Sequence, residues 1–281
     1  MSASLVGSEM CIRDRSKGAT MTLKITVLLE NRKRKNSLLA ARPGLSLLIQ
    51  ANESTILFDT GPDDSFYQNA MSMNIDLKKI DAVVLSHGHY DHCGGVPSLP
   101  CNTKIICHPS IANVRYAALN LLGRYRQIKK LSLDIDYSRH QMLFTKSPLE
   151  INKSLIWSGE IAVATPAVYG ALDENTPDVV IDEGVLIYKH HRGLVIITGC
   201  GHRGLEEIIK HCQNITGINK VHALIGGFHL RCASPMKIIK TRKILSTYNV
   251  EKIYGCHCTG LWGRLWLPQT TSPITGDVIV L

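Results

Sequence analysis

Four side chains that can bind metal ions occur within six residues, at His87, His89, Asp91 and His92. They follow the apolar run of residues 82–85 and therefore lie in the turn after an expected buried strand. Imidazole and carboxylate groups at this density are typical of metal sites and of little else. In such a turn His87 and His89 can converge on one ion, while Asp91 and His92 reach a neighbouring position. The spacing therefore predicts a centre for two metal ions.

Three further apolar runs end close to a histidine, at His202, His229 and His257. Ligands of α/β proteins gather beyond the carboxyl ends of strands, so we expect these histidines to meet the first motif at one rim. We predict that His202 and His257 bind metal and that His229 supports a ligand from behind. The remaining histidines are expected at the surface or in turns: His108, His140, His190, His191, His211 and His222.

Gly199, Gly201 and Gly204 form a GxGxxG pattern between an expected strand and an expected helix, which is the spacing of a dinucleotide-binding turn. That turn requires an acidic residue about 20 positions later, at the end of the next strand, and residues 221–228 contain none. We therefore predict no nucleotide cofactor. The glycines are interpreted as letting the backbone turn tightly beside a metal.

The composition is that of a folded protein with one large or two small domains. Of 281 residues, 44% are hydrophobic and 20% are charged, which excludes a disordered or fibrous chain. No apolar run approaches the roughly 18 residues of a membrane-spanning helix, so we expect no membrane association. The net charge of +9 favours anionic ligands without choosing between a phosphate, a nucleic acid and solubility.

The first residues and the cysteines bear on the natural context of the chain. Residues 9–14 match the translation of a sequencing-adapter end, so we expect residues 1–20 to be a non-native leader and Met21 to be the natural start. Eight cysteines then remain. Because no secretory signal is recognisable, all eight are expected to be reduced thiols in a cytoplasmic protein. Residues 21–281 are expected to form one domain.

Strand-like runs alternate with helical stretches from Leu23 onward, which predicts an α/β protein with sheets covered by helices. The basic run from Arg32 to Lys35 is predicted to be a solvated loop, with an anion-steering patch as the alternative. Helices are predicted at residues 109–122, 203–212 and 235–248. Strands are predicted at residues 23–29, 45–50, 55–58, 81–85, 104–107, 185–188, 194–197, 221–225, 252–254 and 277–280.

The motif from His87 to His92, with Phe58, Asp59, Thr60 and Gly61 upstream, resembles the metallo-β-lactamase superfamily. The likeness covers the chain from about residue 23 to its end and implies a four-layered αβ/βα sandwich. The stretches SHGHYDHCGG, DEGVLIYKHHRGLVIITGCGH, IGGFHL and HCTG further resemble a subgroup that includes dihydropterin ribofuranosylaminobenzene phosphate synthase-like proteins.

The resemblance implies roles for individual residues. Asp59 would hold a ligand from behind. Most members place a bridging Asp where this chain has Cys200, a softer ligand, so either one or two ions could be bound. The subgroup has Ser at Gly201, and glycine loosens the turn that holds His202. The implied ligand sets are His87, His89 and His202 for one metal and Asp91, His92 and His257 for the other.

The leading hypothesis is a metal-dependent hydrolase. One or two zinc ions, or iron or manganese, would lower the pKa of a bound water toward 7, and the hydroxide would attack a phosphate ester or another ester. Asp91 would be catalytic, orienting the hydroxide as well as binding metal. The resemblance implies an alternative, a synthase of pterin cofactor assembly that joins an aminobenzene ribofuranosyl phosphate to a dihydropterin diphosphate. A third hypothesis is a non-catalytic sensor that keeps the metal site as a ligand pocket.

The expected partner is a small anionic, phosphate-bearing substrate rather than a nucleic acid. The positive net charge makes a phosphate more favourable than a neutral group. Arg115, Arg124, Lys129 and Arg264 are the candidate contacts for its negative charge.

Overall fold

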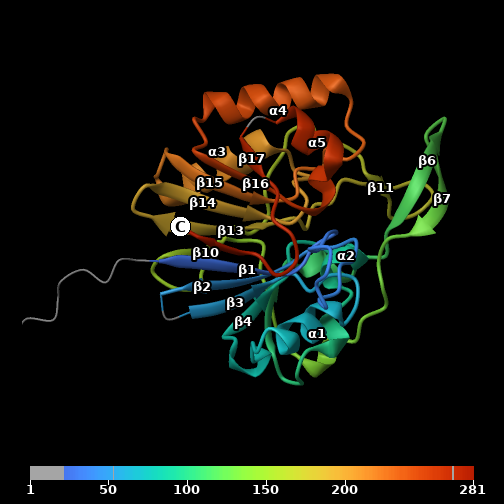
Figure 1. The fold of residues 1–281 in the computed structure, drawn as a ribbon. Helices are drawn as coiled ribbons and strands as arrows, with labels where there is room; N and C mark the ends of the chain where they lie inside the picture. Colours follow the sequence, from blue (N-terminus) through green and yellow to red (C-terminus); the bar gives the residue numbers. More distant parts are fainter. Residues whose placement is uncertain (1–21, 53, 268) are drawn as a thin grey trace, which may run out of the picture.

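Two seven-stranded sheets lie face to face at the centre of the protein (Figure 1). The structure is a computed structural model that describes residues 22–52, 54–267 and 269–281. The predicted leader, residues 1–20, and the predicted start at Met21 lie outside these residues. In the described part of the chain, no helix is long and apolar enough to cross a membrane.

The first sheet is antiparallel on one side and parallel on the other. Strands β18, β1, β2 and β3 pair antiparallel, whereas β3, β4, β5 and β8 are parallel. The carboxyl ends of β3 and β4 therefore lie at one edge and lead directly to Asp59 and to His87. In order across the sheet the strands are β18 (Val278–Val280), β1 (Leu23–Leu29), β2 (Ser46–Ala51), β3 (Ser54–Phe58), β4 (Ala82–Val84), β5 (Lys104–Cys107) and β8 (Gln141–Phe144).

The second sheet also consists of a parallel part and an antiparallel part. Strands β14 to β17 are parallel, and their carboxyl ends lead to Cys200, His229 and His257. Strands β13 and β14 form the predicted hairpin and pair antiparallel. The pairs of β13 with β10 and of β10 with β9 are antiparallel too. The order is β17 (Thr270–Thr271), β16 (Lys252–Gly255), β15 (Val221–Gly226), β14 (Gly193–Thr198), β13 (Val185–His190), β10 (Leu155–Trp157) and β9 (Leu149–Glu150).

Helices cover the outer faces of both sheets. Helix α1 (Ser65–Ser72) packs on the first sheet, and α3 (Leu205–Thr216) and α4 (Pro235–Thr247) pack on the second (Figure 1). Between the sheets lies a third apolar layer that includes Ile25, Phe58, Trp157, Val195 and Ile225. The predicted four-layered αβ/βα sandwich is therefore confirmed. Every predicted strand is present, with its ends shifted by at most two residues.

Short elements connect these layers. Helix α2 (Tyr90–Cys93) carries part of the first motif, and α5 (Gly260–Trp266) follows β16. Single helical turns occur at η1 (Leu77–Lys79), η2 (Val96–Ser98), η3 (Pro109–Ala112), η4 (Tyr137–Arg139) and η5 (His257–Thr259).

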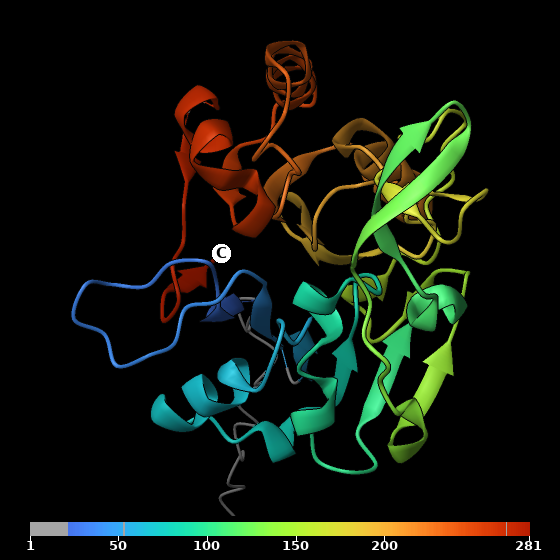
Figure 2. The ribbon, with the colours of Figure 1, turned by 90° about the vertical axis from the view of Figure 1, so that its right-hand side faces the viewer.

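The predicted helix at residues 109–122 is wrong. After η3 the chain enters β6 (Tyr116–Leu121), which pairs antiparallel with β7 (Arg124–Lys130). Leu122 and Gly123 have φ angles of +53° and +91°, which reverse the chain in a tight turn. Cross-strand pairing, which extends to β11 (Gly170–Ala171) and β12 (Pro177–Asp178), thus overrides the local helical pattern. The hairpin projects from the sandwich (Figure 1 and Figure 2).

Four histidines that were predicted at the surface or in turns are buried instead: His108, His140, His190 and His222. Partners explain three of them. His108 Nε2 lies 3.0 Å from a carboxylate oxygen of Glu160, His222 Nδ1 lies 2.8 Å from Glu251, and the ring of His190 stacks on that of His222. These contacts join residues distant in sequence, so the local pattern could not indicate them.

Candidate metal centre

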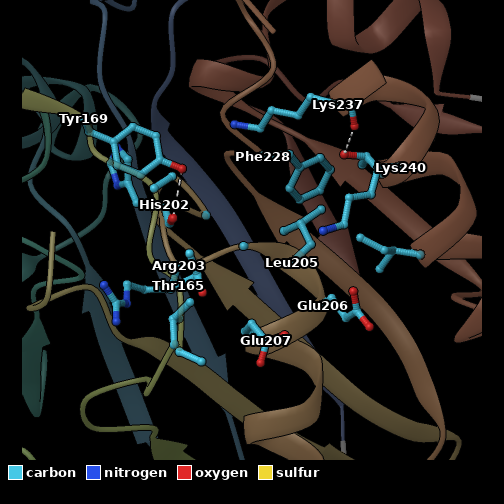
Figure 3. A pocket seen from close by; sticks show the side chains of 17 residues that line it. Thr165, Tyr169, His202, Arg203, Leu205, Glu206, Glu207, Phe228, Lys237 and Lys240 are labelled. Atoms are coloured by element: carbon cyan, nitrogen blue, oxygen red, sulfur yellow. Dashed lines mark hydrogen bonds between the residues drawn. The ribbon is translucent and has the colours of Figure 1, made fainter. Parts of the chain in front are cut away.

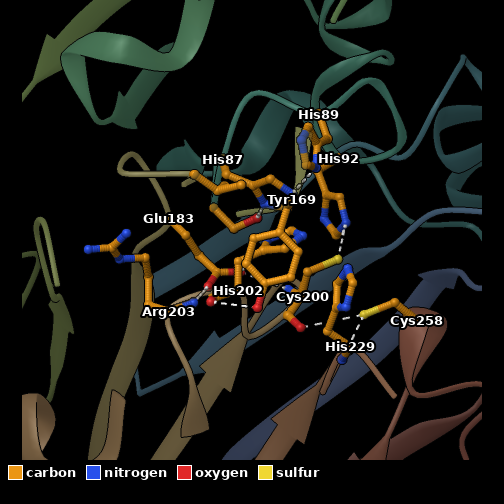
Figure 4. A network of polar contacts seen from close by, with 12 residues as sticks. His87, His89, His92, Tyr169, Glu183, Cys200, His202, Arg203, His229 and Cys258 are labelled. Carbon is orange, nitrogen blue, oxygen red and sulfur yellow. Dashed lines mark hydrogen bonds and ion pairs between the residues drawn. The ribbon is translucent and has the colours of Figure 1, made fainter. Parts of the chain in front are cut away.

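Strand ends from both sheets bring the predicted ligands to one place. The turn after β4 carries His87 and His89, and α2 carries Asp91 and His92. Figure 4 shows His87, His89 and His92 close to His202 and Cys200. The ring centroids of His87 and His202 are 4.8 Å apart, and those of His92 and His257 are 5.0 Å apart. The predicted convergence on one rim is thus present in the structure.

Close approach of the two sheets depends on Gly199. A Cβ atom at Gly199 would lie 2.2 Å from Ser86 Oγ and 3.2 Å from Asp59 Oδ2. The glycine lets the end of β14 reach the end of β4, which sets Cys200 and His202 beside the first motif. The tight turn that the glycine pattern predicts follows at Gly201 and Gly204, whose φ angles are +72° and +86°.

Cys200 belongs to two groups of candidate metal ligands. One group is His87, Cys200 and His202, the other is His92, Cys200 and His257, and the ligand atoms within each lie within 4.8 Å of one another. Cys200 Sγ is 3.1 Å from His92 Nε2 (Figure 4). The thiol therefore occupies the position between two ligand sets, where the resemblance implies a bridging residue.

His89 and Asp91 extend these two groups. His89 Nδ1 lies 3.1 Å from His87 Nε2, and Asp91 Oδ2 lies 3.2 Å from His257 Nε2. Each ligand set implied by the sequence is therefore brought together. A donor set of imidazole, thiol and carboxylate suits zinc, and its imidazoles and carboxylate also suit iron or manganese.

Four ligand histidines are oriented by an oxygen atom on another residue. In each ring Nδ1–H donates to that oxygen, so Nε2 keeps a lone pair directed toward the centre. The pairs are His92 with Asp59 at 2.6 Å, His87 with Ser86 at 2.9 Å, His202 with Glu183 at 3.2 Å and His257 with Asn31 at 2.9 Å. This pattern is typical of metal-binding histidines, and Asp59 contacts the predicted ligand His92.

Three of these partners, Ser86, Glu183 and Asn31, were not predicted. Glu183 also accepts hydrogen bonds from the backbone N–H groups of Cys200 at 3.2 Å and Arg203 at 2.9 Å, which fixes the whole turn after β14. The signal for Glu183 was an acidic pair, Asp182 and Glu183, directly before a buried strand. Asn31 carried no comparable signal, because it lies in a polar loop.

Burial controls the charge of the ligands. It lowers the pKa of His87, His89 and His202 well below the usual value, so these rings are neutral and can bind metal. Burial acts to raise the pKa of Asp91, but contact with His257 and the charge of His92 outweigh it and hold that pKa far below its usual range. Burial also raises the pKa of the Cys200 thiol, so metal binding there would release a proton.

His229 lies beside the ligands rather than among them. Its ring centroid is 4.7 Å from that of His202 and 4.7 Å from that of Tyr169. Burial and the proximity of His202 lower the pKa of His229 to about 3. The hydroxyl of Tyr169 donates to the His202 carbonyl at 2.9 Å (Figure 4). His229 therefore packs beside the predicted ligand His202, and its role in supporting that ligand stays a prediction.

Arg115 does not have the predicted role of an anion contact. It is completely buried, with its guanidinium 3.0 Å from Asp178 and 2.7 Å from Asp182. Asp182 in turn accepts a hydrogen bond from the Gly88 N–H at 2.8 Å. Arg115 therefore stabilises the turn that carries His87 and His89, and two carboxylates already neutralise its charge.

The other candidate cations differ in position. Arg124 lies on the exposed hairpin, and Lys129 Nζ lies 4.9 Å from the ring centroid of Tyr90, next to the first motif. Arg264 lines a cavity together with His257. Arg32, the first residue of the predicted basic loop, also lines this cavity and is only half exposed. The loop is therefore solvated only in part.

Two cavities border the centre. One, of about 520 Å³, is lined by His202, Tyr169, Phe228 and Lys237 among others (Figure 3). The second, of about 440 Å³, is lined by His257. Because His202 and His257 belong to different ligand groups, a substrate can extend from the centre in two directions.

These features are those of a metallo-β-lactamase fold, and the chain belongs to the metallo-β-lactamase superfamily, whose family model matches residues 39–205. It is similar to the 7,8-dihydropterin-6-methyl-4-(beta-D-ribofuranosyl)-aminobenzene-5'-phosphate synthase of Methanocaldococcus jannaschii. The two are 33% identical over 86% of this chain and 90% of the relative.

Solved structures show the same fold. Tm1679, a metal-dependent hydrolase of the β-lactamase superfamily, is 26% identical, with a TM-score of 0.77 over 92% of this chain and 98% of that one. Zn²⁺-bound PqqB from Methylobacterium extorquens is 12% identical, with a TM-score of 0.51 over 91% of this chain and 99% of that one. Members of the superfamily usually bind metal ions, as PqqB does.

Proposed function

We propose that this protein is a metal-dependent hydrolase that acts on a phosphate ester or a related ester. The observation that carries the proposal is the position of Cys200 between two groups of histidines whose Nε2 atoms face other candidate ligand atoms. When bound, one or two zinc ions would lower the pKa of water toward 7 and stabilise negative charge on the substrate. Iron or manganese would suit the imidazoles and the carboxylate equally.

Asp91 is the catalytic residue in this proposal. Its carboxylate is ionised because the contacts with His257 and His92 lower its pKa. The side chain is 22% exposed, so water can reach it. An ionised carboxylate in this position can accept a hydrogen bond from water and orient it toward the substrate.

The proposed substrate is a small phosphate-bearing molecule, and the proposed location is the cytoplasm. A net charge of +9 and the arginines near His257 favour an anion. The eight cysteines in the described part of the chain are all free, which agrees with a reducing compartment.

A second candidate function is a synthase reaction like that of the Methanocaldococcus jannaschii relative. The observation in its favour is the 33% identity over 86% of this chain. Product analysis separates the two functions. With an aminobenzene ribofuranosyl phosphate and a dihydropterin diphosphate supplied together, a condensed product supports the synthase, and release of diphosphate without condensation supports the hydrolase.

Metal content is the first test of either function. Elemental analysis of the purified protein should find about one or two equivalents of a transition metal. A variant with His87→Ala and His89→Ala should retain less than about half an equivalent, because two ligands are removed. A control with His191→Ala and His211→Ala changes two histidines outside the centre and should match the wild type. Equal metal content in both variants would contradict the proposed ligands.

Metal removal is the second test. Treatment with a chelator should abolish hydrolysis of a generic phosphodiester such as bis(4-nitrophenyl) phosphate, and added zinc should restore it. A stripped preparation that keeps full activity would exclude the proposed hydrolase mechanism.

A further inference from the structure

Three arginines from separate segments line the cavity beside His257. Arg32 comes from the loop after β1, Arg231 follows β15, and Arg264 lies on α5. The cavity has a volume of about 440 Å³, which is enough for a phosphate group and part of the molecule that carries it. Three arginines therefore line one cavity together with a candidate metal ligand.

These guanidinium groups retain free N–H donors. The side chains of Arg231 and Arg264 form no hydrogen bond or ion pair with any residue in the described part of the chain. Arg32 donates to the carbonyl oxygen of Ser272 at 3.1 Å, and its buried Nε forms no hydrogen bond but lies 3.9 Å from Glu30 Oε2 in an ion pair. Guanidinium groups with free donors match the geometry of phosphate oxygens.

The carboxylate in the cavity wall cannot neutralise all three charges. Glu30 accepts hydrogen bonds from the backbone N–H groups of His257 at 2.9 Å and Arg32 at 2.7 Å. Burial and the neighbouring charge of Arg32 lower the pKa of Arg264, so the two cations are close enough to repel each other. An anion between them would relieve that repulsion.

The cavity beside His202 has a different charge balance. Three cations line it with two glutamates: Arg203, Lys237 and Lys240 with Glu206 and Glu207 (Figure 3). The excess of positive charge is therefore one in this cavity, whereas it is two in the arginine-lined cavity, where three arginines share the lining with Glu30. An anionic group is therefore attracted more strongly to the arginines.

We propose that the arginine-lined cavity binds a phosphate group of the substrate through Arg231 and Arg264, with Arg32 adding positive charge. The inference rests on the proposed function, because His257 connects this cavity to the metal centre. A phosphate held there would place a neighbouring bond of the substrate at the centre and direct the rest of the molecule toward the cavity beside His202. The substrate would then carry a phosphate that is not the reacting group.

Calorimetric titration with inorganic phosphate and with phenyl phosphate tests this site, on the protein as purified and after metal removal. A variant with Arg231→Gln and Arg264→Gln should bind phenyl phosphate at least about tenfold more weakly, because charge-assisted hydrogen bonds are lost. Arg231 is exposed and Arg264 half-buried, so the variant should fold, and its melting temperature checks this. A control variant with Arg242→Gln and Lys243→Gln removes the same two positive charges from an exposed part of α4 and should leave the affinity unchanged.

Three results would overturn the inference. The first is that the Arg231→Gln, Arg264→Gln variant binds phenyl phosphate with the same affinity as the control variant. The second is that the wild type loses all binding when its metal is removed. The third is that inorganic phosphate binds more tightly than phenyl phosphate. The last would identify free phosphate as the ligand. Hydrolysis of bis(4-nitrophenyl) phosphate by the wild type tests the proposed function separately. If that activity is absent while arginine-dependent binding persists, the hydrolase proposal fails and the phosphate site is supported.

Discussion

Replacing Asp59 with Asn should weaken metal binding in both groups of ligands. The side chain is fully buried, and its Oδ2 accepts hydrogen bonds from His92 Nδ1 at 2.6 Å and from Ser86 Oγ at 2.7 Å. Ser86 Oγ in turn accepts from His87 Nδ1 at 2.9 Å. Because His87 and His92 belong to different groups, one carboxylate orients ligands in both.

The size of the effect follows from these contacts. Ser86 N also donates to Asp59 Oδ1 at 2.7 Å, so three donors converge on the carboxylate, and an amide with one oxygen cannot accept from all of them. A hydrogen bond to a charged group contributes about 1.5–3 kcal/mol. Residues behind metal-bound histidines typically change metal affinity about 10- to 100-fold, or about 1.4–2.7 kcal/mol. Both estimates predict that Asp59→Asn raises the zinc Kd about 10- to 100-fold.

Competition with a colour-changing chelator measures this affinity. Asp134→Asn is the matched control, because it removes the same charge from an exposed side chain that pairs with Lys130. Thermal melting establishes that both variants are folded. A zinc Kd for Asp59→Asn within about threefold of the wild-type value would refute the idea that this carboxylate orients the ligands.

Three further outcomes are expected. Arg115→Met should lower the free energy of unfolding, measured with urea, by about 3–5 kcal/mol, because Asp178 and Asp182 lose their buried partner; a loss below about 1 kcal/mol would contradict that role. Burial and the neighbouring histidines lower the pKa of His190 to about 4, so the unfolded chain binds the proton more tightly and stability should fall as pH drops from about 6.5 to 4. His190→Asn should reduce this dependence, and an unchanged pH profile of the urea midpoint would count against it. Gly199→Ala should lower both melting temperature and zinc content, since its Cβ would meet Ser86 Oγ at 2.2 Å, and wild-type values for both would argue against close packing there.

The elements of the fold were largely predictable because their signals are local. Buried strands such as residues 23–29 and 104–107 are short apolar runs between turns, and the structure contains them with the same ends. The hairpin of β6 and β7 was missed, because its pairing with β11 and the buried ion pairs of Arg115 involve residues 55 to 67 positions away in the chain.

For the site, the sequence by itself determined the residue types and the strand ends that carry them. Four metal-binding side chains within six residues have few other uses, and parallel strands deliver their carboxyl ends to one edge. Only the tertiary structure decided that Cys200 lies between two ligand groups, that Glu183 and Asn31 orient histidines, and that Arg264 meets two other arginines in one cavity. Such distances depend on how the two sheets and their covering helices pack against one another. Packing brings together residues that are far apart in the chain, and no periodic pattern in the sequence indicates which of them will meet.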